Sequence, residues 1–317
     1  MKEELLNRTI DIITSAYNEQ ECIPELYKRI TRVMEKESKY RWRLTIIDNG
    51  SSDSTWSLVS DFATKDSRVR AIRMSRNFSL DAAFTCGLDK ATGVAAIIMC
   101  SDLQDPPEVI PEFLRQFESG FGQVVARITN RPNLPLLRKV ASLTFYKVAD
   151  RLTKNRIPQN VSDFRLMSKA CYEATRQLRE QHRFMRGLSA WVGFRTAFVD
   201  MDRPPRFGGE SHFLKQRFSN VFQWAFQGIL SHTVAPLVWI SALGLIFSVL
   251  SILSLIVFMT IWFTVGIPFA GFLSIISSIA LGFSVNLLFL GVISQYLALV
   301  VEEVKGRPLY VVAEQVG

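Results

Sequence analysis

The chain has 317 residues, 48% of them hydrophobic, which is enough for one large domain or two modest ones. Its formal net charge is +8, yet residues 218–301 contain no Asp, Glu, Lys or Arg. The basic residues are not gathered as in a nucleic-acid-binding protein, so we expect no nucleic-acid partner; an anionic membrane surface and phosphorylated substrates explain the charge better.

Strand and helix patterns alternate over the first hundred residues. The predicted strands are residues 9–16, 44–48, 69–74 and 95–100. One helix is predicted from apolar spacing that begins at Ile23, and another over residues 80–90. This βαβ spacing predicts an α/β domain over residues 1–205, with a mostly parallel, Rossmann-like sheet covered by helices on both faces. The glycine fingerprint of dinucleotide-binding dehydrogenases is absent after the first strand.

The fourth predicted strand, residues 95–100, is an apolar run that ends at polar residues before two prolines. Such a run is typical of a parallel strand buried on both faces, and open α/β sheets bind ligands beyond the carboxyl ends of their strands. Asp102, Gln104 and Asp105 are therefore predicted oxygen ligands at this edge of the sheet. A capped turn before the two prolines is the alternative interpretation.

The charge-free block predicts two transmembrane helices, at about residues 237–263 and 272–301, within a membrane region of residues 233–301. Basic residues before the first span and after the second place both ends in the cytoplasm, with residues 302–317 as a short cytoplasmic tail. A buried helical hairpin in a soluble protein is the alternative. The charged first residues are unlike a signal peptide, so we expect both termini and the N-terminal domain on the cytoplasmic side of the inner membrane.

Between these parts, residues 206–232 are predicted to form a linker and an amphipathic helix lying in the membrane interface. An ordinary core-packing helix would show the same pattern.

The four cysteines lack paired or metal-type spacing, which predicts free thiols. Small residues in the spans offer packing faces for a homo-oligomer.

Three separated motifs carry a family resemblance: Ser15-Ala16-Tyr17-Asn18-Glu19, Asp48-Asn49-Gly50-Ser51-Ser52-Asp53 and Ser101-Asp102-Leu103-Gln104-Asp105-Pro106. Their order and spacing resemble family 2 glycosyltransferases of the GT-A fold. More narrowly, Ser75-Arg76-Asn77-Phe78, Asp163-Phe164-Arg165-Leu166, Arg183-Phe184-Met185-Arg186-Gly187 and Arg307-Pro308-Leu309-Tyr310 resemble polyprenyl-phosphate glycosyltransferases of the GtrB and dolichol-phosphate mannose synthase type.

The resemblance implies transfer of a sugar from a nucleotide diphosphate sugar to a polyprenyl phosphate. UDP-glucose or another UDP-hexose is the implied donor, and undecaprenyl phosphate at the cytoplasmic membrane face is the implied acceptor. The implied reaction is a single inverting displacement by the lipid phosphate, and its product would be a lipid-linked sugar for modification of cell-surface glycans such as O-antigen.

The same resemblance implies roles for individual residues. The implied nucleotide-sugar contacts are Ser15, Tyr17, Glu19, Asp48, Arg76 and Asp102. Asp102 and Gln104 would hold Mg²⁺ or Mn²⁺, since Mg²⁺ prefers hard oxygen ligands and is held by few carboxylates plus substrate phosphates. Asp163, with Arg165 and Asp105, would form the catalytic group. Because a phosphate monoester is mostly dianionic at neutral pH, we favour positioning over proton abstraction for Asp163. An ion pair with Arg165 or another basic neighbour is the structural alternative.

Several arginines are candidates for binding the acceptor phosphate, because the planar guanidinium group can donate two hydrogen bonds to phosphate oxygens. The candidates are Arg127, Arg131, Arg138, Arg183 and Arg206. For Arg127, Arg131 and Arg138, which belong to a basic, acid-poor stretch at residues 127–156, a solvated helix face is the alternative.

Departures from the family pattern keep two other functions open. Cys100 stands where many relatives have an acidic residue, so the chain could be a catalytically impaired nucleotide-sugar-binding partner subunit. A processive polysaccharide synthase shares the catalytic fold, but the Gln-x-x-Arg-Trp motif of those enzymes has no match at Gln181-His182-Arg183-Phe184.

Overall fold

The computed structural model describes residues 8–130, 160–181, 183–208, 235–265 and 271–317. The chain divides into two compact units, Met1–Phe218 with Pro308–Gly317, and Ser219–Arg307. The last ten residues thus belong to the same unit as the N-terminal domain, although the two long helices precede them in the sequence.

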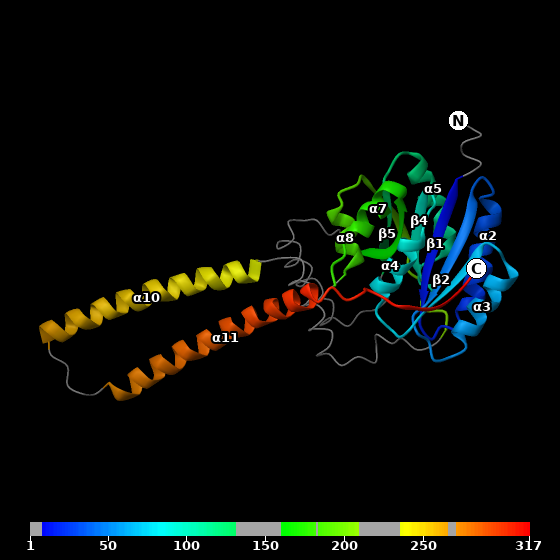
Figure 1. The fold of residues 1–317 in the computed structure, drawn as a ribbon. Coiled ribbons are helices and arrows are strands. Elements are labelled where there is room, and N and C mark those ends of the chain that lie inside the picture. The colour runs from blue at the N-terminus through cyan, green and yellow to red at the C-terminus, as the bar shows by residue number, and fades with distance from the viewer. Residues whose placement is uncertain (1–7, 131–159, 182, 209–234, 266–270) are drawn as a thin grey trace. The chain divides into compact units, whose positions relative to one another are not determined.

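The first unit is built on one eight-stranded sheet of order β7-β5-β6-β4-β1-β2-β3-β8 (Figure 1). Its strands are β1 (Thr9–Ala16), β2 (Arg41–Asp48), β3 (Val69–Met74), β4 (Ala95–Cys100), β5 (Gln123–Asn130), β6 (Val161–Ser168), β7 (Thr196–Asp202) and β8 (Val312–Val316). Only β6 and β8 run against the other strands of this sheet. The predicted mostly parallel α/β fold is confirmed.

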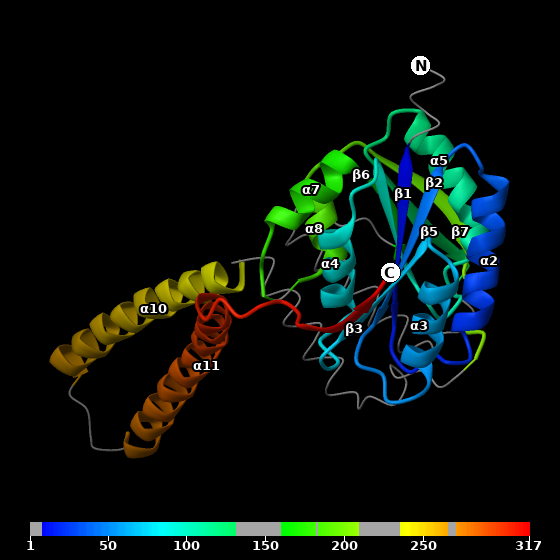
Figure 2. The same ribbon diagram turned by 45° about the vertical axis from the view of Figure 1, so that its right-hand side comes forward.

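Helices cover both faces of the sheet, as Figure 2 shows. On one face lie α2 (Ile23–Lys36), α3 (Thr55–Lys65) and α5 (Ile110–Glu118), the last preceded by the short 3₁₀ turn η1 (Pro107–Val109). On the other lie α4 (Leu80–Lys90), α7 (Lys169–Gln177) and α8 (Met185–Trp191). Strand residues point alternately to the two faces, so Ile12 and Ile13 of β1 belong to two separate buried clusters, one beneath each helix layer.

The sequence placed most of these boundaries well. The strands at 9–16, 69–74 and 95–100 and the helix at 80–90 have the predicted bounds. The second strand begins at Arg41, three residues before the predicted start at Leu44. Trp42 accounts for the extension, since its ring is buried in the core and stacks edge-on against Tyr40.

The C-terminal residues, which the sequence suggested only as a short tail, form the edge strand β8. This strand pairs with β3 in antiparallel register, and the backbone N–H of Ser75 donates to the carbonyl of Val311 over 2.9 Å. Just before it, the hydroxyl of Tyr310 donates to Asp89 at the end of α4 over 2.8 Å. The tail is therefore anchored to the domain at two places.

The second unit contains α10 (Ala235–Val265) and α11 (Phe272–Val304). Both predicted spans are helical, and the helices extend slightly beyond the predicted bounds. Within the described residues, one segment is long and apolar enough to cross a membrane, Leu281–Val304, with a mean hydropathy of 1.9. A hairpin in which α10 also spans the membrane stays a prediction. The predicted interfacial helix falls largely in residues 209–234, outside the described residues.

Candidate active site

The candidate site lies at the edge of the sheet where β1, β2 and β4 end. β1 pairs in parallel with both neighbours, with Ala16 level with Asp48 and Ser15 level with Cys100. β6 runs the other way, so its first residues lie at this same edge, and continuing its register with β4 brings Asp163 level with Cys100. The topology thus gathers the three sequence motifs and Asp163, which are far apart in the chain.

The loops after β1 and β2 are tied together by hydrogen bonds. Asn18, in the left-handed region with φ 55°, accepts from the backbone of Ser52 and donates its own N–H to Ser51, both over 2.9 Å. The next N–H, that of Glu19, donates to the hydroxyl of Thr55 over 2.9 Å. These bonds fix the position of Glu19, whose side chain is buried.

Asp48, the last residue of β2, is fully buried, and one of its carboxylate oxygens accepts no hydrogen bond from the residues that the structure describes. Its Oδ1 accepts the backbone N–H of Ser51 over 3.0 Å. Its Oδ2 lies 3.4 Å from Nε of Arg73 but forms no hydrogen bond within the described residues. Burial raises the pKa of Asp48, although the bonds from Ser51 and the charge of Arg73 oppose the rise. A buried acceptor of this kind is costly unless a ligand donates to it.

The loop after β3 is held against the end of β2 by Asn49 and Gly50. The Asn49 side chain donates to the carbonyl of Ser79 and accepts from the N–H of Phe78, both over 3.0 Å. Gly50 has φ +74°, and a Cβ there would lie 2.5 Å from the carbonyl carbon of Arg76. Only glycine allows this approach. Arg76 is exposed above the loop, with its guanidinium 3.9 Å from the Phe78 ring centre.

In the loop after β4, partly exposed and buried side chains alternate along the chain. Asp102 and Gln104 are partly exposed, whereas Leu103 and Asp105 are buried. Leu103 has φ 60°, and Oδ1 of Asp102 accepts the N–H of Gln104 over 3.1 Å. The loop therefore presents one carboxylate and one amide to the open side of the sheet edge, which fits their predicted role as metal ligands.

Asp105 has a different surrounding from Asp102. It is 0% exposed, its Oδ2 accepts the N–H of Cys100 over 3.0 Å, and its Oδ1 accepts the hydroxyl of Ser162 over 2.9 Å. Both oxygens are thus used to join the β4 loop to the start of β6. This geometry favours a positioning role for Asp105, and its predicted catalytic role stays a prediction.

Asp163 forms a bidentate ion pair with Arg186 at the start of α8. Nε and Nη2 of Arg186 donate to the two carboxylate oxygens over 2.8 and 2.6 Å. Arg165, the predicted ion-pair partner, is farther away, with its guanidinium 3.9 Å from Asp163. Burial alone would raise the pKa of Asp163, but the charge and hydrogen bonds of Arg186 outweigh it and hold that pKa below its ordinary value.

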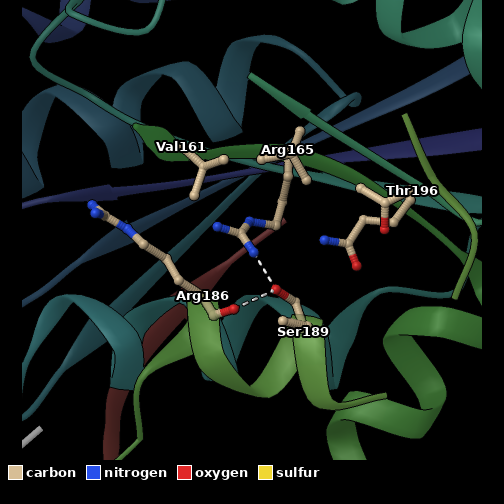
Figure 3. Close-up of a pocket in the computed structure, with 8 residues that line it drawn as sticks. Val161, Arg165, Arg186, Ser189 and Thr196 are labelled. Carbon is tan, nitrogen blue, oxygen red and sulfur yellow. Dashed lines mark hydrogen bonds between the residues drawn. The ribbon is translucent and has the colours of Figure 1, made fainter. Parts of the chain in front are cut away.

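Arg165 is itself a structural residue. Its side chain is 2% exposed and donates to the carbonyls of Asp163 and Ser162 and to the hydroxyl of Ser189 on α8. Burial lowers its pKa to about 10, so it stays charged at neutral pH. Figure 3 shows Arg165 and Arg186 on the two sides of a cavity of about 100 Å³ between β6 and α8. The pair of arginines joins α8 to the strand that carries Asp163.

Residues 206–208 lie against the ends of β1 and β4. Nη2 of Arg206 donates to Glu19 over 2.7 Å, and the N–H of Phe207 donates to the carbonyl of Asp102 over 3.4 Å. Burial raises the pKa of Glu19, opposed by Arg206 and reinforced by repulsion from Asp102. Glu19, Asp102 and Arg206 therefore share one electrostatic environment, and Arg206 is close to the site as predicted.

Two other predicted phosphate-binding arginines lie in the described residues, and each bonds to other groups of the domain. Arg127 pairs with Asp200 across β5 and β7, with hydrogen bonds of 2.6 and 2.9 Å on an exposed part of the sheet. Arg183 donates to the carbonyls of Thr175 and Leu178 at the end of α7, which gives it a structural role. Arg131 and Arg138 lie outside the described residues.

The sequence alone missed two arginines of the site. Arg186 lies in the quoted motif that begins at Arg183, and the three-residue spacing could not show which of the two faces Asp163. Arg203 lies just after β7, and its charge lowers the pKa of both Asp105 and Asp163 against their burial. Its Nε is buried without a hydrogen-bond partner in the described residues. No pattern in the sequence distinguished Arg203 from a linker residue.

The chain is similar in sequence to known glycosyltransferases over most of its length. Residues 11–175 match the family model described as glycosyl transferase family 2. The chain is 37% identical over 311 residues to a glycosyltransferase of Synechocystis sp., covering 97% of this chain and 96% of that one. It is 34% identical over 310 residues to the bactoprenol glucosyl transferase of Shigella phage SfII, covering 96% and 97% of the two chains.

Among solved structures, glucosyl-3-phosphoglycerate synthase of Mycobacterium tuberculosis in complex with Mn²⁺ and UDP-glucose aligns with a TM-score of 0.48 and 17% identity. The alignment covers 73% of this chain and 81% of that one. The family match spans the loops that carry Glu19, Asp48 and Asp102 as well as Asp163, and the full-length relatives extend it through both long helices. The chain belongs to glycosyl transferase family 2.

Proposed function

We propose that the protein transfers glucose from UDP-glucose to a polyprenyl phosphate such as undecaprenyl phosphate, giving a lipid-linked glucose. The observation that carries the proposal is the sheet edge where Asp102 and Gln104 are partly exposed, with Glu19 and Asp163 at the ends of neighbouring strands. Relatives named bactoprenol glucosyl transferase, similar over nearly the whole chain, support the choice of sugar and acceptor.

The donor would bind with its nucleoside at the ends of β1 and β2. Asp48 offers a buried carboxylate oxygen without a partner, which suits an N–H donor of the base. Glu19 lies beside it on the tied loop, and Tyr17 and Arg76 border the same edge. Ser15 is buried in β1, so it would act through the strand end and not through an open contact.

A divalent cation, Mg²⁺ or Mn²⁺, would be held by Asp102 and Gln104. Both partly exposed side chains offer oxygen ligands, and of the two Asp102 oxygens it is Oδ1 that accepts the N–H of Gln104. No group of three His, Cys, Asp or Glu side chains in the described residues could hold a metal. Substrate phosphates would therefore complete the coordination. The cation would offset the charge of the leaving diphosphate.

Asp163 would hold Arg186 in place, and the positive charge of Arg186 would help to orient the acceptor phosphate for an inverting attack on the anomeric carbon. Arg186 lowers the pKa of Asp163, which makes this carboxylate a weak base at neutral pH. An acceptor phosphate that is mostly dianionic needs no base. Arg203 and Arg206 lie close enough to balance the negative charge gathered at this edge.

The return of the chain to the sheet supports a membrane hairpin. β8 belongs to the same sheet as β1, yet α10 and α11 lie between them in sequence. If α11 crosses the membrane, α10 must cross it as well, because residues on both sides of the pair fold into one domain. Basic residues flank the pair, which favours a cytoplasmic domain and cytoplasmic termini in an inner-membrane protein. Homo-oligomers could form through the same helices.

The test is a transfer assay on the full chain in detergent, with labelled UDP-glucose, Mn²⁺ and undecaprenyl phosphate. We expect a labelled lipid product with wild-type protein, loss of at least 100-fold in rate for Asp102→Asn, and normal rates for the control Asp61→Asn on exposed α3. Absence of lipid product with every nucleotide sugar would support the impaired-subunit alternative. Labelled polymer formed without lipid would support the processive synthase.

A further inference from the structure

We propose that Glu314 of β8 is a positioning residue of the donor site, which holds Arg73 so that the free oxygen of Asp48 stays available to the nucleoside. The inference rests on the proposed function, since it assumes that Asp48 binds the nucleoside. It assigns a role in donor binding to the strand that follows the two long helices.

Arg73 stands between two carboxylates on neighbouring strands. The sheet register places it level with Asp48 on one side and with Glu314 on the other. Its Nη1 donates to Oε1 of Glu314 over 3.0 Å, whereas its Nε is 3.4 Å from Oδ2 of Asp48. The guanidinium also lies 5.7 Å from the ring centre of Trp56 on α3. The Arg73 guanidinium therefore forms a hydrogen bond with Glu314 but lies near Asp48 without a hydrogen bond to it.

This arrangement explains why a buried carboxylate beside an arginine keeps an oxygen without a partner. Asp48 is 0% exposed, and its Oδ2 accepts no hydrogen bond from the described residues. Bidentate pairing with Arg73 would satisfy that oxygen, and guanidinium forks favour such pairing. The bond to Glu314 directs one amino group of the fork away from Asp48. A ligand N–H can then donate to Oδ2, with the positive charge of Arg73 still nearby.

Glu314 suits a positioning role better than a stabilising one. Its side chain is 53% exposed and that of Arg73 is 34% exposed, so the pair contributes little to folding. The link spans 241 positions of the sequence. Without the carboxylate of Glu314, the fork is free to close onto Asp48 and to compete with the nucleoside for its oxygen.

The experiment compares Glu314→Gln with wild type, using the full chain in detergent. The variant keeps the shape of the side chain and removes its charge. We expect the Kd for UDP, measured by titration calorimetry, and the KM for UDP-glucose to rise roughly fivefold, with an unchanged KM for undecaprenyl phosphate. The matched control is Gln315→Ala, on the neighbouring exposed position of β8, which should leave all three values unchanged.

A second comparison separates positioning from a general effect on β8. In an Arg73→Gln background, Glu314→Gln should not change the Kd for UDP further, because its effect acts through Arg73. Glu314→Asp, which keeps the charge, should recover part of the affinity. Unchanged Kd and KM in Glu314→Gln, or an equal loss in the Arg73→Gln background, would overturn the inference while wild-type transfer upholds the proposed function. A wild-type protein that binds no UDP would overturn both.

Discussion

The ion pair between Asp163 and Arg186 gives the sharpest test of how the site is held. Replacing Arg186 by Met keeps most of the side-chain volume and removes both hydrogen bonds, which measure 2.8 and 2.6 Å. The Asp163 side chain is 14% exposed, so its carboxylate would be left nearly buried. Breaking such a pair typically costs about 3–5 kcal/mol.

Two features of the structure reduce that cost. Arg186 is itself 27% exposed, and Arg165 stays 3.9 Å from the carboxylate as a second positive charge. We therefore expect the free energy of unfolding to fall by about 2–3 kcal/mol, which corresponds to a decrease in Tm of roughly 4–12 °C. The rate of glucosyl transfer should fall at least 100-fold, because Asp163 would lose its orientation.

The pH dependence of stability identifies the group responsible. In wild type the pKa of Asp163 is held below its ordinary value of 3.8, so the pair stabilises the protein above that pH and loses its effect as pH falls through the lowered pKa. In Arg186→Met, burial is less opposed and the pKa of Asp163 should rise. The difference in Tm between wild type and variant should therefore be largest near neutral pH and narrow as the solution is acidified.

Thermal unfolding of the full chain in detergent, followed by circular dichroism between pH 4 and 8, measures this difference. The control is Arg127→Met, which breaks a bidentate pair on the exposed part of the sheet and should change neither Tm nor rate appreciably. A Tm for Arg186→Met within 1 °C of wild type at neutral pH would refute the reasoning. So would a Tm difference that does not depend on pH.

Two further predictions concern the loops of the site. Gly50→Ala should lower the free energy of unfolding by about 2 kcal/mol and weaken UDP binding, because φ is +74° and the new Cβ would meet the backbone of Arg76; an unchanged Tm would contradict the close approach. Asp105→Ala should lower it by about 2–4 kcal/mol by leaving the Cys100 N–H and the Ser162 hydroxyl without their acceptor, with urea unfolding as the measurement. Retained stability would return Asp105 to the list of catalytic candidates.

The sequence by itself determined the α/β architecture and much of the donor edge. Apolar runs and helical spacing predicted four strands and the helix at residues 80–90, because such side-chain patterns follow directly from local backbone geometry. Asp102, Gln104 and Asp105 were predicted as oxygen ligands from their place after a buried strand, and the structure leaves Asp102 and Gln104 partly exposed there. These inferences needed only neighbours along the chain.

Tertiary structure decided which partner each charged residue meets. Asp105 looked like a third ligand in sequence, but its neighbours in space turn it into a buried link to Ser162, 57 positions away. Arg183 and Arg186 are both arginines of the same motif, and the sequence does not distinguish them. The packing of α8 against β6 brings Arg186 into contact with Asp163. Long-range ion pairs depend on strand order and helix packing, which no local pattern encodes. The strand β8 could not be predicted for the same reason, because its partner strand β3 lies more than 200 residues earlier in the chain.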